Sequence, residues 1–343
     1  MARIAVDAMG GDFAPRAPIA GALRALDALP AEHHIELVGR TAVIEAELGA
    51  LLGGELSALV HVRDRIAIVE APDIIEMTDR PSVAIRGKTN SSMVVGLKRV
   101  ADGHADGFVS AGNTGAQMAG SLVHLKLLAG LTRPAIGTLF PTAKAPILVL
   151  DSGANVDCSP EELVQFARIG TVYARALLGR ENPAVGLLSI GEEPEKGNAV
   201  VKDAHQRLLG AGLNFLGNVE GRDLPAGACD RGDIDVVVCD GFTGNILLKF
   251  YEGIGPMLIG MISRVAGLDA RSIAGSLTQL DVDEQGGAPL LGVRGVSIIS
   301  HGKSSPRAMM NAIFVAVRAH ESDMTAEIGR RLADSQTPTG TAA

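Results

Sequence analysis

The chain has 343 residues, of which 47% are hydrophobic, so it can bury a large core and is not disordered throughout. Its 39 acidic and 31 basic residues give a formal net charge of -8, and only 3% of its residues are aromatic, with no Trp. A nucleic-acid binding role is therefore not expected, because a generally basic surface and aromatic stacking platforms are both missing.

The cysteines and the first residues of the chain indicate in which cellular compartment the protein is expected. Cys158, Cys229 and Cys239 form no CxxC pair, and an odd number in a long chain argues against a disulfide framework. The opening MARIAVDAMGG reads as a β-strand and not as a secretory signal. No stretch approaches 18 uncharged apolar residues. We expect a cytoplasmic protein without a membrane-spanning segment.

Short apolar, β-branched runs alternate with helix-length segments along the chain. In order, the strand-like runs are RIAVDA, HIELVG, ADGFVSAG, PILVLDSG, AVGLLSIG, LNFLGNV, IDVVVCDG and GVSIISHG. Runs this apolar are typical of parallel strands that helices cover on both faces. The pattern predicts a three-layer α/β/α Rossmann-like sandwich.

The alternation is not interrupted by a Pro- or Ser-rich linker, so we expect one α/β catalytic domain over residues 1–334. Residues 335–343, SQTPTGTAA, lack apolar periodicity and are predicted to be a disordered tail. An apolar helical segment is predicted near 246–280. Its apolar stripe over 246–268 fits a core or dimer interface, a surface for acyl chains, or a surface that lies on a bilayer.

Most of the strand-like runs end in Gly and a small polar residue. The loops concerned are DAMGGDFAP, SAGNTGA, DSGANVDC, SIGEEPEKGN, CDGFTGN and SHGKSS. The carboxyl ends of parallel strands share one edge of the sheet, where helix N-termini favour anions. Glycines such as Gly241 and Gly244 let the backbone approach a ligand closely. Each loop alone also fits an ordinary turn, but six together predict an anion-binding edge.

Three of these loops carry side chains suited to chemistry. Lys196 can hold its ammonium over a phosphate or a developing oxyanion, or be a solvated lysine beside glutamates. His301 and Lys303 combine a proton-transfer group with a cation. Asn245 either donates its amide to an oxyanion or caps a helix that begins at Ile246.

Residues 79–99 carry a local positive patch in an otherwise acidic chain. Its members are Arg80, Arg86, Lys88, Lys98 and Arg99. Such a patch can steer an acidic partner or an anionic substrate, and it equally fits a solvated helix face.

Familiar motifs of other enzyme classes are absent from the sequence. It contains no GxSxG elbow, no GxxxxGK[ST] loop, and no GxGxxG spacing in DAMGGDFAP. The eight histidines are scattered without HExxH, and the adjacent His33 and His34 fit a surface turn. We therefore expect neither a metal nor a cofactor.

In their order and length, several segments resemble the bacterial acyl-ACP:phosphate acyltransferases (PlsX), from about residue 3 to about residue 320. These segments are IAVDAMGGDFAP, KTNSSMVVGL, ADGFVSAGNTGAQMA, LDSGANVDCSPEELVQFARIG, VGLLSIGEEPEKGN, NFLGNVEGRDL, DVVVCDGFTGNILLK and GGAPLLGVRGVSIISHGKSS. The resemblance implies the fold of the isocitrate and isopropylmalate dehydrogenases and of the phosphotransacetylases. It also implies a homodimer with loose peripheral membrane contact.

The reaction implied by the resemblance is transfer of a fatty acyl group from acyl carrier protein (ACP) to inorganic phosphate. The acyl phosphate would serve phospholipid synthesis through a downstream glycerol-3-phosphate acyltransferase. Phosphate is already a nucleophile and the thioester is already activated, so no serine or cysteine triad is required. Positioning of the phosphate and donors for the oxyanion would suffice.

Site residues follow from the resemblance by motif position. Catalytic roles are implied for Lys196, Asn245 and His301, with His301 either protonating the leaving thiolate or binding phosphate. The implied further site candidates are Asn113 and Thr114, and the loop pattern adds Gly241, Gly244 and Lys303 as substrate-binding candidates. Arg86 and Lys88 become candidates for docking acidic ACP. Ser189 is a departure, because the family is expected to have Asn there.

Two other function classes remain open. A metal- and NAD(P)-dependent decarboxylating dehydrogenase of similar fold needs a paired acidic array, for which Asp151, Asp157 and Asp240 are the candidates. Each of these also fits a turn or a helix cap. A non-catalytic scaffold that binds ACP or a membrane would leave the polar loops at so many strand ends unexplained.

Overall fold

The computed structural model describes residues 1–267 and 286–334. The predicted tail at 335–343 and the part of the predicted apolar segment beyond 267 lie outside the described residues. By their internal contacts, the described residues form two compact units. Unit 1 holds residues 1–126 and 286–322, and unit 2 holds residues 127–267 and 323–334. The expectation of a single domain over 1–334 stays a prediction.

The strands of unit 1 lie in the order β3-β2-β1-β4-β13-β12. Their bounds are β1 (Arg3–Asp7), β2 (His34–Gly39), β3 (Ile66–Glu70), β4 (Gly107–Ser110), β12 (Ala288–Leu291) and β13 (Val296–Ile299). All neighbouring pairs are parallel except β12 with β13. The near-continuous apolar runs of the sequence thus become buried parallel strands, as predicted.

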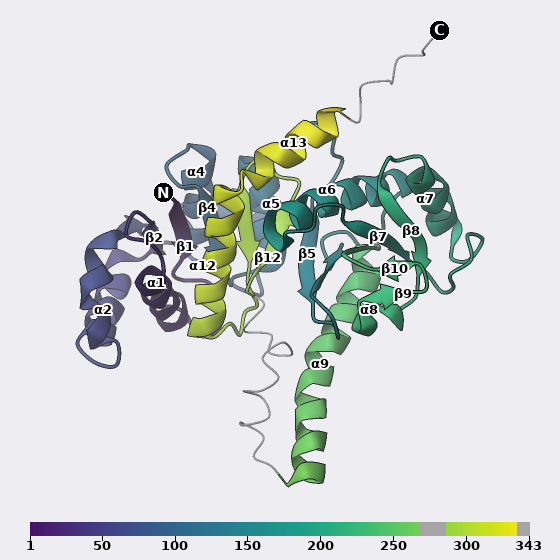
Figure 1. Ribbon diagram of the computed structural model, residues 1–343. Helices are drawn as coiled ribbons and strands as arrows, with labels where there is room; N and C mark the ends of the chain where they lie inside the picture. The colour runs from purple at the N-terminus through teal and green to yellow at the C-terminus, as the bar shows by residue number, and fades with distance from the viewer. Residues whose placement is uncertain (268–285, 335–343) are drawn as a thin grey trace. The chain divides into compact units, whose positions relative to one another are not determined.

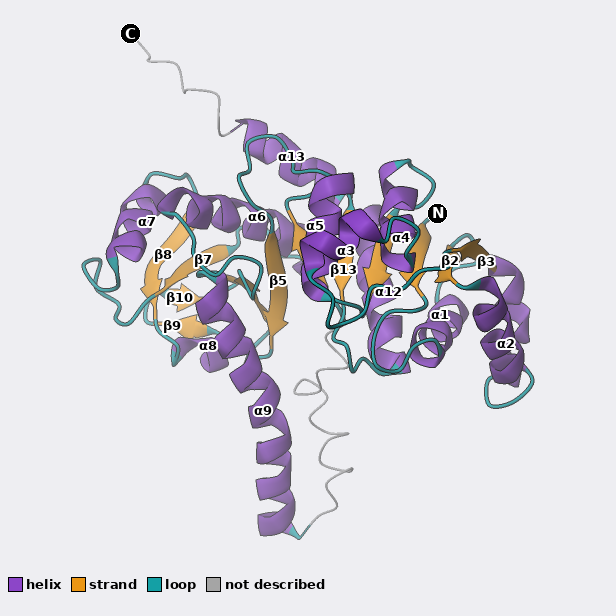
Figure 2. Cartoon of the chain, turned by 180° about the vertical axis from the view of Figure 1, so that it is seen from behind, coloured by secondary structure: helices purple, strands orange, loops and turns teal. Residues whose placement is uncertain are grey.

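Helices cover both faces of the unit 1 sheet. On one face, α1 (Arg16–Ala28) and α12 (Pro306–Glu321) pack together, and α2 (Thr41–Leu52) and the 3-10 helix η1 (Ser57–Arg65) pack against α1 (Figure 1). On the other face lie α3 (Pro81–Gly87), α4 (Ser92–Ala101) and α5 (Thr114–His124) (Figure 2).

Unit 2 repeats the layering with strands in the order β5-β6-β11-β7-β8. Their bounds are β5 (Ala135–Phe140), β6 (Ile147–Leu150), β7 (Ala184–Leu188), β8 (Asn214–Val219) and β11 (Val236–Val238). All pairs are parallel except β5 with β6. A small hairpin, β9 (Ala228–Cys229) and β10 (Gly232–Asp233), lies outside this sheet.

Alternate residues of β6 show why the unit 2 sheet is apolar on both faces. Ile147 and Val149 belong to a buried cluster against which α9 (Gly241–Ala266) packs. Leu150 faces Gly170 of α6 (Pro160–Leu178) on the opposite face. The other helices of unit 2 are α7 (Ala199–Leu209), α8 (Asp223–Ala226) and α13 (Met324–Asp334). The α/β/α sandwich predicted from the sequence is confirmed.

Helix α9 has 26 residues and extends well beyond the rest of unit 2 (Figure 1). Its first turns pack on the core through Leu247, Leu248 and Tyr251. Further along, large apolar side chains are exposed, among them Met257 and Met261. By length and composition alone, α9 is long and apolar enough to cross a membrane, although it contains no run of 18 uncharged residues.

Candidate active site

Glycine-rich loops follow three adjacent parallel strands in each unit. In unit 1, residues 8–15, 111–113 and 300–305 follow β1, β4 and β13, and we call them the unit 1 loops. In unit 2, residues 151–159, 189–198 and 239–240 follow β6, β7 and β11, and we call them the unit 2 loops. Because the strands are parallel and adjacent, each set of loops gathers at the carboxyl edge of its own sheet.

Asp7, which the sequence did not mark as important, links the loop after β1 to the end of β4. Its buried carboxylate accepts from the N–H of Met9 at 3.0 Å and from the hydroxyl of Ser110 at 2.7 Å. Burial raises the pKa of Asp7, against the opposing effect of these hydrogen bonds. The carboxylate sits so close to the next loop that a Cβ on Gly10 would lie 2.6 Å from its Oδ2.

Asn113 and Thr114, two predicted substrate contacts, lie at the start of α5. The buried Asn113 caps the helix by accepting from the N–H of Ala116 at 3.0 Å. Its Nδ2 donates to backbone carbonyls, including those of Met77 and Asp79 at 3.1 Å each. The Asn113 amide is thus occupied within the chain. The Thr114 hydroxyl is exposed at the helix N-terminus, with no hydrogen-bond partner in the described parts of the chain.

His301 and Lys303 are both exposed in the unit 1 loop after β13. The Nδ1 of His301 accepts from the backbone N–H of Lys303 at 3.1 Å. A neutral His301 therefore carries its proton on Nε2, from which it can donate a hydrogen bond. Lys303 makes no ion pair with any described residue. The buried hydroxyl of the neighbouring Ser300 also has no described partner.

Asp151 fixes the loop after β6 in unit 2. Its fully buried carboxylate accepts from the N–H groups of Ile136, Gly153, Ala154 and Asn155, at 2.7 to 3.1 Å, and from the Asn155 amide at 2.9 Å. Burial is the largest influence and raises the pKa of Asp151. The carboxylate faces the backbone of its own loop, so it is a structural group.

The start of α9 packs directly on this Asp151 loop. A Cβ on Gly244 would lie 1.9 Å from the Asp151 carbonyl oxygen, and one on Gly241 would lie 2.5 Å from that of Asn155. These two predicted substrate-contact glycines therefore have a packing reason to lack a side chain. They allow the N-terminus of α9 to approach the loop after β6.

Asn245 is not a helix cap. The prediction that a helix begins at Ile246 is wrong, because α9 begins at Gly241 and Asp240 caps it by accepting from the Thr243 N–H at 2.8 Å. A side-chain oxygen one residue before a helix satisfies an otherwise unpaired N–H, and Asp240 provides it. The exposed Asn245 lies beside Gly153, with no described partner for its amide. Asn245 remains an available donor.

Lys196 is exposed in the unit 2 loop after β7. It forms no ion pair with any described glutamate, and Glu192 pairs instead with Arg222 at 3.0 Å. Asn218 anchors this loop by donating from its buried amide to the Glu193 carbonyl at 2.7 Å. Asn218 lies on β8, about twenty residues away in the sequence, so no local pattern marks it.

Ser189, the position where Asn was expected, begins the same loop. Its N–H donates to the Val219 carbonyl at 2.9 Å, and its hydroxyl is buried without a described partner. A Cβ on Gly197, whose φ is +101°, would lie 3.0 Å from that hydroxyl. The hydroxyl therefore lies against the turn that presents Lys196.

The cysteines near the unit 2 loops are unsuited to nucleophilic catalysis. Burial raises the pKa of Cys158 to about 12 and that of Cys239 well above its ordinary value, and the charge of a nearby aspartate adds to both shifts. A thiol that stays protonated at neutral pH is a poor nucleophile. Cysteine chemistry is not needed to explain this edge of the sheet.

The acidic residues near the unit 2 loops do not form a metal array. Asp151 and Asp240 are engaged by N–H donors, as described above. In the described ranges, no three His, Cys, Asp or Glu side chains gather as metal ligands would. The carboxylate pair that a decarboxylating dehydrogenase needs is therefore not assembled from Asp151, Asp157 and Asp240.

The positive patch at 79–99 is only partly available. Lys88 donates to the carboxylate of Asp79 and to the Ile74 carbonyl at 2.9 Å. Arg99 forms a two-pronged ion pair with the buried Glu36, at 2.6 and 2.8 Å. The other three basic residues are exposed and make no described ion pair: Arg80, Arg86 and Lys98.

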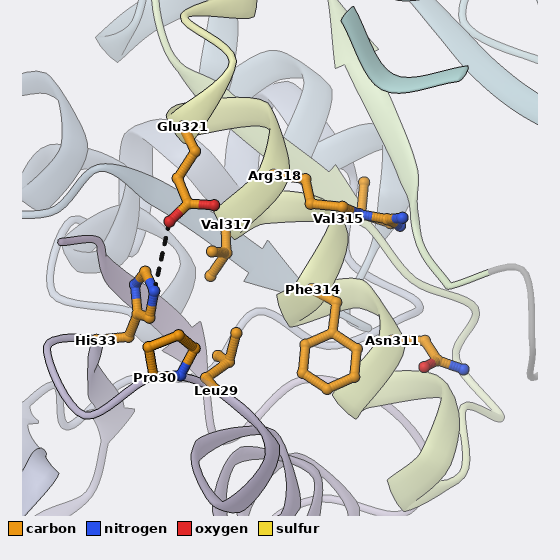
Figure 3. Close-up of a pocket in the computed structure, with 9 residues that line it drawn as sticks. All are labelled: Leu29, Pro30, His33, Asn311, Phe314, Val315, Val317, Arg318 and Glu321. Carbon is orange, nitrogen blue, oxygen red and sulfur yellow. Dashed lines mark ion pairs between the residues drawn. The ribbon is translucent and has the colours of Figure 1, made fainter. Parts of the chain in front are cut away.

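A cavity of about 430 Å³ in unit 1 lies beside the amino end of β2, at the opposite edge from the unit 1 loops (Figure 3). His33 lines it and is only 3% exposed, so the expectation of a surface turn is wrong for this residue. Its Nδ1 accepts from the Ala2 N–H at 3.1 Å, and its Nε2 lies 3.4 Å from the Glu321 carboxylate. His33 thus ties the start of the chain to the end of α12.

Comparison with known proteins shows which family the chain resembles. The chain matches the model of the fatty acid synthesis protein family over residues 2–327. The phosphate acyltransferase of Moorella thermoacetica is 46% identical over 337 residues, covering 95% of each chain. That of Elusimicrobium minutum is 43% identical and covers 97% of this chain and 96% of its own.

Solved structures share the fold at much lower identity. The EutD phosphotransacetylase from Staphylococcus aureus has a TM-score of 0.61 at 16% identity, covering 93% of this chain and 94% of its own. A branched-chain phosphotransacylase from Enterococcus faecalis has a TM-score of 0.60 at 15% identity, covering 93% and 99%. Because both the family match and the close relatives span nearly the whole chain, this protein belongs to the fatty acid synthesis protein family of phosphate acyltransferases and is an acyltransferase enzyme.

Proposed function

We propose that the enzyme transfers a fatty acyl group from acyl-ACP to inorganic phosphate, giving an acyl phosphate and free ACP. The close relatives are named for acyl transfer with phosphate, and the family is named for fatty acid synthesis. The solved structures of similar fold are named phosphotransacetylase and phosphotransacylase. These names support phosphate as the acceptor and a fatty acyl group as the group transferred.

One observation carries the proposal. At both carboxyl edges the buried carboxylates, Asp7 and Asp151, face donors of the chain itself. The candidates that remain exposed and unpaired are cations or hydrogen-bond donors, with Lys196 and Asn245 in unit 2 and Lys303 in unit 1. Exposed donors beside buried carboxylates that the chain itself already binds suit an anionic substrate.

The chemistry needs few protein groups. An oxygen of phosphate attacks the thioester carbonyl carbon, a tetrahedral oxyanion forms, and the C–S bond then breaks to release the ACP thiolate. Lys196 and the Asn245 amide are suited to hold phosphate and the oxyanion, because both donate without a competing partner. The thiolate takes up a proton, which a His301 protonated on both ring nitrogens can supply.

The proposal also includes the enzyme's partners: ACP, a membrane or a second subunit, and a downstream acyltransferase. The exposed Arg80, Arg86 and Lys98 suit an acidic carrier protein, because opposite charges steer encounter. The exposed apolar side chains of α9 suit a peripheral membrane contact or a homodimer interface. The product is an activated acyl anhydride, which a glycerol-3-phosphate acyltransferase would consume in phospholipid synthesis. An acyl-ACP donor also favours a cytoplasmic enzyme.

The deciding experiment follows acyl-ACP consumption with and without inorganic phosphate, using mass spectrometry to detect acyl phosphate. The wild type should form acyl phosphate only with phosphate present. Lys196→Ala should lower kcat/KM by about a hundredfold or more, since it removes a charged donor to the transition state. Lys202→Ala is the matched control, because Lys202 is exposed one turn into α7 and should have little effect.

Each outcome bears on a different part of the proposal. Acyl phosphate formation that survives Lys196→Ala would remove Lys196 from the site while leaving the reaction in place. Binding of acyl-ACP without phosphate-dependent turnover would contradict the proposed reaction and favour a scaffold that binds ACP.

A further inference from the structure

Three arginines line one cavity in unit 2, at the amino ends of β7 and β8. The cavity measures about 280 Å³. Arg168 and Arg175 come from α6, and Arg331 comes from α13, which packs on α6. Within the described residues, no carboxylate lines it. The cavity thus concentrates positive charge in a chain whose net charge is -8.

Arg175 is the most informative of the three. Its Nε donates to the Glu181 carbonyl at 3.0 Å, and its terminal nitrogens have no partner in the part of the chain that the structure describes. Burial, and after it the positive charge of Arg331, lower the pKa of Arg175, while the charge of Glu327 acts in the opposite direction. A half-buried guanidinium beside a second cation is electrostatically unfavourable, and a bound anion would relieve it.

Arg331 shares an acidic neighbour on α13 with Arg330. Its Nε donates to Glu327 at 2.8 Å, while the other oxygen of Glu327 accepts from Arg330 at 3.0 Å. One carboxylate is therefore shared by two guanidinium groups. The amide of Asn182, which also lines the cavity, has no described partner and adds a neutral donor.

The chemistry and the size of the cavity define what it can bind. Guanidinium groups match phosphate oxygens in geometry and charge, and a lining without carboxylates does not repel them. The volume lies just below the range of about 300–1,000 Å³ typical of pockets for drug-sized ligands. We propose that this cavity binds a small phosphorylated anion, of about the size of pyrophosphate or a short sugar phosphate.

This binding site is separate from the unit 2 loops. Asn182 and Pro183 precede β7, whereas Ser189 and Lys196 follow it. Five residues of strand at about 3.3 Å each place the two ends roughly 16 Å apart. A small anion at the amino end therefore does not reach the loops at the carboxyl end, and the proposal does not depend on the proposed reaction.

Calorimetric titration of the full chain with inorganic pyrophosphate tests the site. The wild type should bind about one pyrophosphate per cavity, and Arg175→Gln and Arg331→Gln should each weaken binding about tenfold, since each removes a charge-assisted donor. Arg264→Gln is the control, because it makes the same charge change at an exposed arginine of unit 2 that does not line the cavity and has no described ion pair. It should leave affinity within about twofold.

Lys196→Ala separates this cavity from the unit 2 loops, which are expected to bind phosphate as well. Pyrophosphate binding that persists in Lys196→Ala supports the proposal. Binding that Lys196→Ala abolishes and Arg175→Gln leaves intact would place the anion at the loops and overturn it. If the control variant weakened binding as much as Arg175→Gln and Arg331→Gln do, the loss of affinity would come from the overall charge of the protein. This result too would overturn the proposal.

A second measurement keeps the test valid if Arg175→Gln folds poorly. In amide NMR spectra of the wild type, pyrophosphate should shift the resonances of Gly212 and Asn214, which line the cavity. Arg175→Lys, which keeps the charge without the planar fork, should bind about threefold or more weakly. Saturation of the wild type without shifts at these amides would overturn the proposal.

Discussion

At the scale of single residues, polar side chains at the carboxyl edges divide into two groups. Asp7, Asn113 and Asp151 are buried and bound to the chain itself. Lys196 and Asn245 are exposed without described partners. In the sequence all five look alike, as polar residues within three positions of a glycine. Their division depends on which backbone donors reach them, and these come from other segments of the chain.

The buried Asp7 gives a pH-dependent prediction for stability. Burial raises its pKa above the ordinary value of 3.8, so the folded protein holds this proton more tightly than the unfolded chain. Its contribution to stability is therefore complete below about pH 4 and is lost as the pH rises through the folded-state pKa. Asp7→Asn removes an acceptor and should destabilise the protein by about 1–3 kcal/mol at pH 4.5.

The difference in free energy of unfolding between the wild type and Asp7→Asn should shrink between pH 4.5 and pH 7.5, by at most about 1.4 kcal/mol per pH unit. The reason is that the wild type must bury a charge as Asp7 ionises, whereas the variant has no charge to bury. Free energies of unfolding from urea titrations at the two pH values measure it. Asp64→Asn, at an exposed aspartate, should show no such trend. A deficit that grows with pH would mean that Asp7 is stabilised as a carboxylate, contrary to the argument.

At the scale of elements, α9 shows how tertiary contacts fix a helix that sequence patterns placed only approximately. The apolar stripe was predicted from 246, but the helix begins at Gly241 because Asp240 caps it. The two glycines of its first turn pack against the loop after β6. The start of this helix therefore depends on a loop about ninety residues earlier.

Two glycines of α9 should respond in opposite directions to the same change. Gly244→Ala would place a Cβ 1.9 Å from the Asp151 carbonyl oxygen, whereas a Cβ on Gly253 meets nothing within 4 Å. Gly244→Ala should destabilise the fold by about 3 kcal/mol or more, since backbone must move. Gly253→Ala should be neutral or stabilise by up to about 1 kcal/mol. Urea unfolding of both variants compares them, and similar losses in both would contradict the close packing at Gly244.

The exposed stripe of α9 gives a second prediction for this element. Met257→Gln with Met261→Gln should release the protein from vesicles of phosphatidylcholine and phosphatidylglycerol, because it removes apolar contact area. The mass from light scattering should stay that of the wild type. Met257→Leu with Met261→Leu, which keeps the stripe apolar, should sediment with vesicles as the wild type does. A fall in mass of the Gln variant relative to the wild type would instead make the stripe a subunit interface.

At the scale of the whole molecule, a net charge of -8 should repel an acidic carrier protein except where cations gather. Of the five basic residues at 79–99, Lys88 and Arg99 are paired to acidic groups of the same unit. Of the two residues predicted to dock ACP, Arg86 is therefore the better candidate than Lys88, because Arg86 is exposed and has no described ion pair.

Arg86→Glu should raise KM for acyl-ACP about tenfold at low salt and leave KM for phosphate unchanged, because it acts on encounter with a large acidic partner. Arg24→Glu makes the same charge change at another exposed, unpaired site of unit 1 and should have a smaller effect. Steady-state kinetics with each substrate varied in turn measure both. Equal changes in the two KM values would argue against docking at Arg86.

The sequence by itself determined the layered α/β fold, the glycine-rich loops at the strand ends and the family. These follow from local properties: apolar runs, residues that permit tight turns, and long segments in a fixed order. The burial of His33, the inward-facing Asp7 and Asp151, the cap at Asp240 and the arginine-lined cavity were decided only by tertiary structure. Each of them joins segments tens of residues apart, and whether a polar group is exposed or satisfied depends on those distant neighbours.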